Sequence, residues 1–336
     1  MKDLRFLTAL HPELFKASKQ VSQDDFFGYS YFHFNKIREK LDKTLSHFNR
    51  IPLRKADYMD YSMVHNEDYL EKLLQRANGK EVTLDSRQGI DCKGLEYLIP
   101  GYQYYLGMLM EAIDRMKAGM LDRAYFFGMG GHHAHPNWGH GYCLLNSTAA
   151  AAKYALSNGF SKILIIDWDI HHGDGTQEIF SKDDNVYCIS IHSAIDLYMN
   201  KAVGVIHGTT TYGEKSGNCN IPLLDQFFED NFFEEMELPG KFYRANESIS
   251  IFEEKISNLP WKPDLIFIFS GYDSHKNDCG AGITNWGNED FKKLTRMVCN
   301  LSEKISAPII SCHGGGYTFD VAYEAALAHI EEFSIR

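Results

Sequence analysis

The segment that most constrains this chain runs from Lys162 to Gly175 and reads KILIIDWDIHHGDG. It begins with four consecutive branched apolar residues at 163–166, a run typical of a parallel strand buried on both faces. Ionisable side chains then crowd the next positions, namely Asp167, Asp169, His171, His172 and Asp174. A buried strand that ends in so many ionisable groups predicts a polar site at its carboxyl end.

The spacing of these residues points to a bound cation. Side chains alternate along a strand, so Asp167, Asp169 and His171 are expected on one side. Burying carboxylates beside an imidazole is costly unless a cation lies among them. Open α/β sheets bind ligands at the carboxyl ends of their strands, which is where this cation would lie. The alternative interpretation is a hydrogen-bonded polar turn without a metal.

Length and composition narrow the class of protein. A chain of 336 residues can form one large α/β domain or two ordinary ones. Hydrophobic residues at 44% and charged residues at 24% are typical of a globular protein. The formal net charge of −11 argues against direct nucleic-acid binding, since phosphate-backbone binders present a basic surface.

The cell compartment is predicted from the N-terminus and the cysteines. The charged first residues indicate no signal peptide, and no apolar run is long enough to span a membrane. Seven scattered cysteines, never spaced as C-x-x-C, indicate reduced thiols. We therefore expect a cytoplasmic protein with no membrane contact.

Helices and strands alternate through the last two-thirds of the chain. We expect helices over about 34–48, 64–77, 104–118, 146–157, 249–259, 290–305 and 321–332, and strands over 124–128, 163–166, 186–192, 265–269 and 308–311. The segment 82–100 has no clear period and is expected to be a loop. The pattern predicts an α/β fold in which helices cover both faces of one parallel sheet in three layers. Without a linker or repeat, residues 1–336 are expected to form a single domain.

Every polar cluster of interest follows a predicted strand. G-G-H-H-A at 130–134 follows the strand ending near Phe127, Asp273 follows Phe269, and H-G-G-G-Y at 313–317 follows Ile310. The carboxyl ends of parallel strands share one edge of a sheet, so these segments are expected to converge on one pocket.

The residue types in these clusters suit metal-assisted hydrolysis. Asp169, His171 and Asp273 offer two carboxylates and one imidazole, a set that suits zinc or ferrous iron and leaves coordination open for water and substrate. Two carboxylates nearly cancel the charge of the metal, so a separate base is needed, and His132 and His133 are candidates.

Further residues suit supporting roles at such a site. Asp167 and Asp174 are spare acids suited to orient the two imidazoles. Tyr317 follows three glycines and is suited to donate a hydrogen bond to a developing oxyanion. His135, His140 and His192 are interpreted as packing or loop residues, and Cys143 lacks a base partner.

Five ordered motifs together resemble the zinc-dependent histone deacetylase family, which has the arginase–deacetylase fold, including its bacterial deacetylase-like and acetylpolyamine amidohydrolase-like members. The motifs lie between residue 124 and about 320 and read G-G-H-H-A at 130–134, G-Y-C-L-L-N at 141–146, D-W-D-I-H-H-G-D-G at 167–175, S-G-Y-D at 270–273 and H-G-G-G-Y at 313–317. The resemblance covers this span and, weakly, the helix near residues 65–69.

The resemblance implies a role for each matching residue. It implies metal ligation by Asp169, His171 and Asp273. It implies that His133 is the catalytic base, oriented by Asp174. It implies that His132 is an electrostatic partner, hydrogen-bonded to Asp167. It implies that Tyr317 polarises the scissile carbonyl.

The resemblance also implies a structural potassium site and a substrate tunnel. The potassium site would use Asp167, Asp169, His171, Ser190 and Ile191. The walls of the acyl-lysine tunnel would come from Tyr142 with Gly141, from Gly315, and from Tyr198 or Met199.

Three positions depart from the family pattern. The histidine pair follows Met129-Gly130-Gly131 in place of a proline-glycine pair. Gly280 stands where many members carry a large apolar gate residue and acetylpolyamine-specific members a glutamate. His275 stands where the arginase branch needs a second acid, which argues against a two-metal site.

The sequence therefore predicts an amidohydrolase that uses Zn²⁺, or alternatively Fe²⁺, to remove an acyl group, expected to be acetyl, from the ε-amine of lysine in a peptide or protein. One alternative is an acetylpolyamine hydrolase, which would use an acid such as Asp85, Asp91 or Glu96 at the pocket rim. A dimer partner is another source of such an acid. The alternative from another class is a catalytically silent binding module. The intact set of metal ligands, histidine pair and tyrosine argues against this alternative. A homo-oligomer is compatible with both enzyme interpretations.

Overall fold

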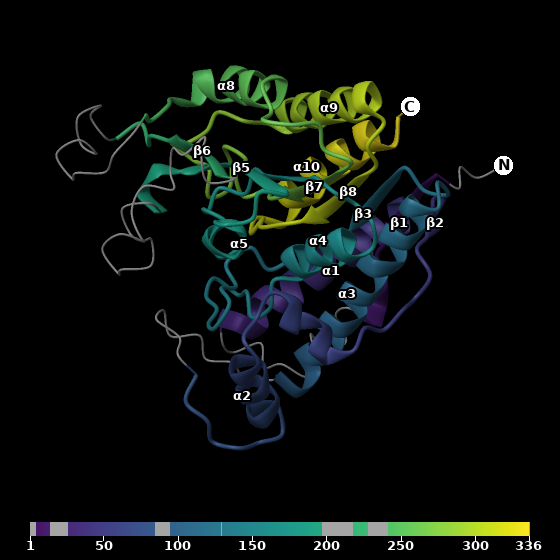
Figure 1. Ribbon diagram of the computed structural model, residues 1–336. Helices are drawn as coiled ribbons and strands as arrows, with labels where there is room; N and C mark the ends of the chain where they lie inside the picture. The colour runs from purple at the N-terminus through teal and green to yellow at the C-terminus, as the bar shows by residue number, and fades with distance from the viewer. Residues whose placement is uncertain are drawn as a thin grey trace. The chain divides into compact units, whose positions relative to one another are not determined.

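The computed structural model describes residues 5–13, 26–84, 95–128, 130–196, 218–227 and 241–335 (Figure 1). Two compact units make up the chain. The first contains Met1–Phe160, Asp174–Ile179 and Ile310–His313, and the second contains Ser161–Gly173, Phe180–Ile309 and Gly314–Arg336. Each unit is built from parallel strands and helices.

The strands of the first unit are hydrogen-bonded in the order β2-β1-β3-β8. Strand β1 pairs in parallel with both β2 and β3. Their bounds are β1 (Phe6–Ala9), β2 (Asn49–Arg50), β3 (Arg123–Phe126) and β8 (Ile309–His313). The accompanying helices are α1 (Phe26–Thr44), the 3₁₀ helix η2 (Tyr58–Met63), α2 (Glu67–Ala77), α3 (Leu95–Lys117), α4 (Ser147–Ser157) and α5 (Asp174–Phe180).

Local sequence explains where two of these helices begin and end. Helix α2 ends at Asn78 and Gly79, and Gly79 has the left-handed φ of 77° that a helix stop favours. Helix α4 begins at Asn146, whose side chain accepts a hydrogen bond from the N–H of Ala149. The alanines of α4 are completely buried, and their small size lets α4 pack closely on α3.

The second unit contains the central strands of the predicted sheet. Its strands are hydrogen-bonded in parallel in the order β7-β4-β5-β6. Their bounds are β4 (Ile163–Asp167), β5 (Val186–Ser193), β6 (Asn218–Leu223) and β7 (Leu265–Ser270). Helix α8 (Ala245–Ser257) packs on β5, β6 and α9 (Asn288–Ile305), which packs on α10 (Phe319–Ser334), and Figure 1 shows α8 and α9 side by side.

The register of these strands determines where the polar residues meet. Every residue of β4, β5 and β7 is buried, as expected for central strands of a parallel sheet. Asp167, at the end of β4, is the register partner of Ser190 on β5 and of Phe269 on β7. The strands β4 and β7 therefore end nearly level, β5 continues to Ser193, and the loops that follow the three strands leave from the same edge.

Several local predictions were wrong. Helix α1 begins at Phe26, eight residues before the expected start near residue 34, because its aromatic-rich first half shows no clear helical period. Helix α3 begins at Leu95 and contains Pro100, where a loop was expected over 82–100. Asp169 and His171 lie beyond the end of β4, so strand alternation does not place them.

Three strands went unpredicted. Strands β1 and β2 have four and two residues, which is too short to show a period. Strand β6 reads NCNIPL, in which asparagines and a proline obscure its strand character. Among the described residues, no helix combines the length and apolar character that a membrane span requires.

Candidate active site

Three predicted metal ligands meet in the second unit. Asp169 and His171 lie in the loop after β4, and Asp273 lies in the loop after β7. The Nδ1 atom of His171 is 3.1 Å from Oδ1 of Asp169 and 3.0 Å from Oδ2 of Asp273. Both carboxylates are buried, whereas the His171 side chain is 36% exposed. Their ligand atoms lie close enough together to hold a metal ion.

Backbone groups hold the two carboxylates in position. The N–H of Ile170 donates to Oδ1 of Asp273 at 3.0 Å, and the N–H of Gly315 donates to Oδ2 of Asp169 at 2.6 Å. A Cβ atom on Gly315 would lie only 2.2 Å from Oδ2 of Asp273. Gly315 therefore contacts both carboxylates directly, through its N–H and its lack of a side chain.

The protonation of the cluster indicates that it fits a divalent cation. Burial and then the neighbouring Asp169 raise the pKa of Asp273 to about 8. Burial disfavours the charged form of His171, but hydrogen bonds to Asp169 and Asp273 outweigh it and raise its pKa well above the usual value. The folded cluster therefore holds protons more tightly than the isolated side chains do, and a bound divalent cation would take the place of these protons.

Tyr317 lies beside this cluster in the same unit. It follows the three glycines between β8 and α10, and its ring is edge-on to the His171 ring at a centroid distance of 6.3 Å. The carboxylate of Asp278 accepts the backbone N–H of Tyr317 at 3.0 Å and that of Thr318 at 2.6 Å. Asp278 was not singled out from the sequence, because nothing in its spacing indicates this contact.

Residues of the predicted potassium site also lie together in the second unit. Asp167 and Ser190 are register partners on β4 and β5, Ile191 follows Ser190, and Asp167 accepts the N–H of Asp169 at 3.0 Å. The Oγ of Ser190 is buried and has no hydrogen-bond partner among the described residues. Burial and then Asp169 raise the pKa of Asp167 well above its usual value. A buried hydroxyl without a hydrogen-bond partner among the described residues, beside a buried acid, fits a monovalent cation.

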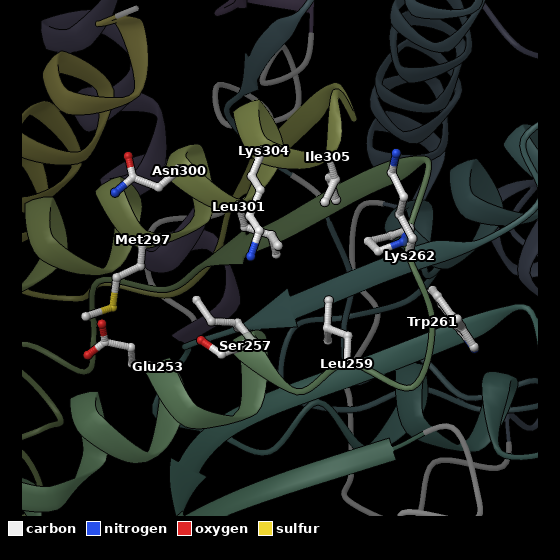
Figure 2. Close-up of a pocket in the computed structure, with 12 residues that line it drawn as sticks. Glu253, Ser257, Leu259, Trp261, Lys262, Met297, Asn300, Leu301, Lys304 and Ile305 are labelled. Carbon is white, nitrogen blue, oxygen red and sulfur yellow. The ribbon is translucent and has the colours of Figure 1, made fainter.

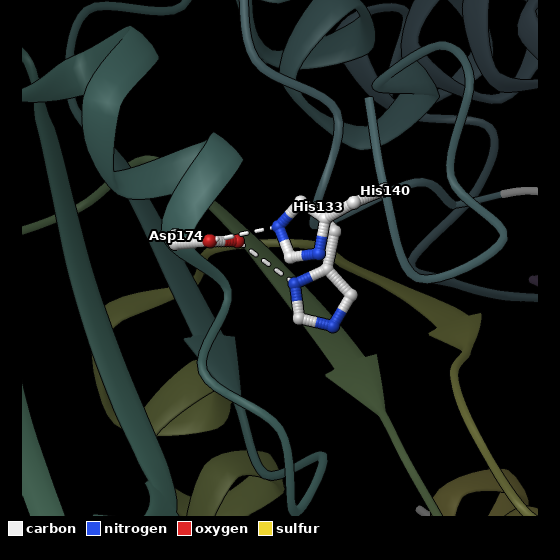
Figure 3. Close-up of side chains that lie close together, drawn as sticks. All are labelled: His133, His140 and Asp174. Carbon is white, nitrogen blue, oxygen red and sulfur yellow. Dashed lines mark hydrogen bonds and ion pairs between the residues drawn. The ribbon is translucent and has the colours of Figure 1, made fainter. Parts of the chain in front are cut away.

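The predicted base and its partner acid meet in the first unit. Asp174, at the start of α5, accepts hydrogen bonds from Nδ1 of His133 and Nε2 of His140, each at 2.8 Å (Figure 3). Burial alone would raise the pKa of Asp174, but the surrounding imidazoles outweigh it and hold the pKa well below its usual value. An ionised carboxylate only accepts hydrogen bonds, so both of these ring nitrogens carry protons.

His133 consequently has the protonation state that a general base needs. Burial first, then His132 and His140, lower the pKa of His133 to about 3, so the ring is neutral at physiological pH. A neutral ring protonated on Nδ1 has its lone pair on Nε2. The His132 ring lies 4.0 Å from the His133 ring between centroids. His132 belongs to the first unit and Asp167 to the second, so their expected pairing stays a prediction.

Two of the predicted substrate residues have unusual backbone conformations. Gly141 and Tyr142 are consecutive left-handed residues, with φ of 53° and 65°. A Cβ atom on Gly141 would lie 2.4 Å from Cδ2 of His133, so only glycine fits against this ring. A tyrosine with positive φ is strained, and such strain concentrates at functional sites. Tyr198 and Met199 lie outside the described residues.

Sequence analysis missed the residues that surround Asp174. His135 and His140 were interpreted as loop residues, yet Nε2 of His135 lies 3.3 Å from the Asp174 carboxylate and its Nδ1 contacts Glu178. Trp138 stacks on His135 at a centroid distance of 3.9 Å. The only signal was the density of histidines around the pair at 132–133.

Gly280 and His275, two of the positions that depart from the family pattern, pack against their own neighbours. A Cβ atom on Gly280 would lie 2.3 Å from the carbonyl oxygen of Ser274, so the backbone leaves no room for a side chain. His275 stacks nearly parallel to Phe291, and its Nδ1 accepts the N–H of Asn277 at 3.1 Å.

A separate hollow lies in the second unit at the opposite ends of its strands. It has a volume of about 480 Å³ and is lined by the C-terminal parts of α8 and α9 and by the loop that leads into β7 (Figure 2). Its polar lining includes Glu253, Lys262 and Lys304. The hollow has no paired acid and base, so it does not compete with the strand-end clusters as a catalytic site.

Comparison with known proteins identifies the class. The family model described as "Histone deacetylase domain" matches residues 32–333. The chain is 29% identical over 286 residues to a histone deacetylase-like amidohydrolase of Pseudomonas aeruginosa, covering 82% of this chain and 68% of the relative. A probable deacetylase of Archaeoglobus fulgidus is 28% identical over 270 residues, covering 80% of this chain and 69% of the relative.

Two further relatives are larger or more distant. The chain is 34% identical over 231 residues to type-2 histone deacetylase 2 of Dictyostelium discoideum, covering 63% of this chain but only 12% of that protein. The crystal structure of the HDA15 HD domain superposes with a TM-score of 0.75 and 20% identity, covering 98% of this chain and 87% of that structure.

The chain therefore belongs to the histone deacetylase family. The structural likeness confirms the predicted parallel α/β fold of the deacetylases. Family membership supports a hydrolase of the deacetylase and amidohydrolase type.

Proposed function

We propose that this protein is a zinc-dependent deacetylase that removes acetyl groups from the ε-amine of lysine in peptides or proteins. The observation that carries the proposal is the cluster of Asp169, His171 and Asp273, in which two buried carboxylates lie about 3 Å from Nδ1 of one imidazole. Cations with this ligand set hydrolyse amides.

These three residues would hold the metal. When bound, zinc polarises the amide carbonyl and makes water more acidic. The N–H groups of Ile170 and Gly315 hold the two carboxylates in place beside the His171 ring. Ferrous iron suits the same ligands, and metal analysis distinguishes the two.

His133 acts as the general base in the proposed reaction. Asp174 holds the proton on Nδ1, so the lone pair on Nε2 takes a proton from the attacking water and passes it to the leaving amine. His132, with Asp167 as its expected partner, provides electrostatic support. Overall, the amide C–N bond breaks, hydroxyl from water joins the acetyl carbon, and the remaining proton goes to the lysine nitrogen.

Tyr317 donates its phenol O–H to the oxygen of the scissile carbonyl. Negative charge develops on that oxygen as water attacks, and one donor that meets this charge lowers the barrier by about 3 kcal/mol. The Asp278 carboxylate anchors the backbone of Tyr317, which supports this role.

Absence of a carboxylate at the gate position favours lysine over a polyamine. Gly280 offers no acid to select a cationic tail, and Tyr142 offers an aromatic wall for the methylene stem of lysine. An acetylpolyamine substrate would require an acid from elsewhere. Glu96 is exposed in the first turn of α3, whereas Asp85 and Asp91 lie outside the described residues.

Three further features complete the proposal. A structural K⁺ would occupy the site of Asp167, Asp169, His171, Ser190 and Ile191, where the orphaned Ser190 hydroxyl supports it. Residues 1–336 would act as one catalytic domain. Within the described residues no cysteine is in a disulfide, which supports a reducing, cytoplasmic setting.

The test compares substrates and variants of the zinc-loaded protein. We expect kcat/KM for an acetyl-lysine peptide to exceed that for acetylated putrescine and spermidine. A preference for the polyamines that is lost when Glu96 is neutralised would replace lysine with a polyamine as the substrate. No hydrolysis of any acylated amine, with zinc fully bound, would leave the binding-module alternative.

A further inference from the structure

Both oxygens of the Asp174 carboxylate are occupied by imidazoles. Oδ1 accepts from His133 and Oδ2 accepts from His140, at the same distance of 2.8 Å (Figure 3). All three side chains are buried, with 2% of the Asp174 side chain exposed. A second histidine therefore shares the acid that orients the proposed base.

From this geometry we propose that His140 is a positioning residue, which holds the carboxylate of Asp174 in the orientation that aims His133. The inference rests on the proposed function of His133 as the base. It concerns residues of the first unit alone, and no metal takes part in it.

The contacts of His140 explain how it acts. Its ring packs on the His133 ring at a centroid distance of 4.4 Å and on Trp138 at 5.2 Å, so it has little freedom to turn. Without its N–H, Oδ2 of this buried, ionised carboxylate would keep only the longer contact to Nε2 of His135 at 3.3 Å, and a poorly satisfied buried charge is costly. The carboxylate would then rotate or attract another donor, and either change would alter its bond to His133.

His140 also sets the basicity of His133. A carboxylate that is shared by two donors stabilises the protonated form of each donor less than a carboxylate that binds one donor alone. In the first unit, the titratable groups that act on His133 are His132, His140 and Asp174. His135 contacts the Asp174 carboxylate, and Glu178 contacts His135 in turn. Of these, His132 and His140 lower the pKa of His133 and Asp174 raises it.

Two substitutions separate the hydrogen bond from the ring. His140→Phe keeps an aromatic ring against Trp138 and His133 but removes the donor. His140→Gln keeps a neutral N–H donor near the position of Nε2 but removes the ring. We expect His140→Phe to lower kcat about tenfold, a usual cost of losing an orienting partner. We expect His140→Gln to restore most of the lost kcat.

The pH profile distinguishes positioning from a general structural defect. Activity requires neutral His133, so it falls as pH drops through the pKa of this ring. Loss of His140 raises that pKa, so the acidic limb of the kcat/KM profile should move to higher pH by about one unit in His140→Phe. A variant that is merely less folded would lose amplitude at every pH without moving the limb.

His329→Phe is the matched control. His329 is another fully buried histidine, in α10, where its ring stacks on Phe333. We expect the acidic limb of this variant to coincide with that of the unaltered protein. An unshifted limb in His140→Phe, with kcat unchanged, would overturn the positioning role.

His133→Ala shows whether the underlying function or the inference has failed. Full activity of His133→Ala would remove the proposed base, and the role of His140 with it. If His133→Ala is inactive while His140→Phe behaves as the unaltered protein, the proposed function stands and only the inference about His140 is rejected.

Discussion

Asp278 accepts the backbone N–H of Tyr317 at 3.0 Å through the same carboxylate oxygen that accepts the N–H of Thr318 at 2.6 Å. Thr318 precedes the first turn of α10, so one carboxylate both caps this helix and fixes the backbone of the proposed oxyanion donor. The position of the Tyr317 phenol consequently depends on a side chain 39 residues away in sequence.

Asp278→Ala should lower kcat about tenfold while zinc content stays complete, because the ligands are unchanged and only the tyrosine loses its anchor. Tyr317→Phe, which removes the donor entirely, should slow turnover by roughly 10²–10³. Asp290→Ala is the control, since Asp290 accepts the N–H of Gly287 at the start of α9. Equal kcat losses in Asp278→Ala and Asp290→Ala would indicate a general stability effect.

Asp169→Asn and Asp273→Asn should each lose both bound zinc and activity. Each change removes an anionic ligand from a site with three protein ligands, and the remaining pair binds the metal weakly. Metal analysis of the purified variants measures this directly. Full zinc occupancy in both variants would contradict the ligand assignment, whatever the activity.

Gly315→Ala should also lose zinc, although it changes no ligand. The added methyl would meet Oδ2 of Asp273 at 2.2 Å and push the carboxylate out of position. Gly287→Ala is the matched control, since no atom lies closer than 3.9 Å to its Cβ position. Zinc content near that of the unaltered protein in Gly315→Ala would show that the loop yields without moving the ligand.

Stability should fall in mild acid, in part through His329. Burial lowers the pKa of His329 to about 3, whereas an exposed histidine titrates near 6.5. Between these values the unfolded chain binds a proton that the folded chain excludes, so stability is lost as pH falls below 6.5. The contribution approaches about 1.4 kcal/mol per pH unit.

His329→Phe should remove this part of the acid sensitivity. Thr295 donates its hydroxyl to the carbonyl oxygen of Phe291 and so remains bonded without the histidine. Urea unfolding at pH 7 and pH 5 measures the effect. The loss of unfolding free energy between these values should be smaller in the variant, and an equal loss would show that His329 does not titrate on unfolding.

Sequence periodicity determined the central strands and most of the helices. Strands β4, β5 and β7 are buried on both faces, and continuous apolar residues are the direct consequence. The same logic could not reveal β1, β2 or β6, because short or polar strands are stabilised by their neighbours and carry no period of their own.

Residue types and their order along the chain determined the candidate ligands and the proposed acid–base pair. The register of Asp167 with Ser190 and Phe269 explains why motifs about a hundred residues apart meet in the second unit. That register was not needed to name Asp169, His171 and Asp273, since their chemistry alone suggested a metal.

Only the tertiary structure decided what surrounds these residues. His140 is hydrogen-bonded to Asp174, 34 residues away, and Asp278 to the backbone of Tyr317, 39 residues away, and no spacing rule connects such positions. The sequence-based interpretation of His140 as a loop residue missed its contact with Asp174 for this reason. A side chain's type limits the bonds that it can make, but the fold alone determines which partner it reaches.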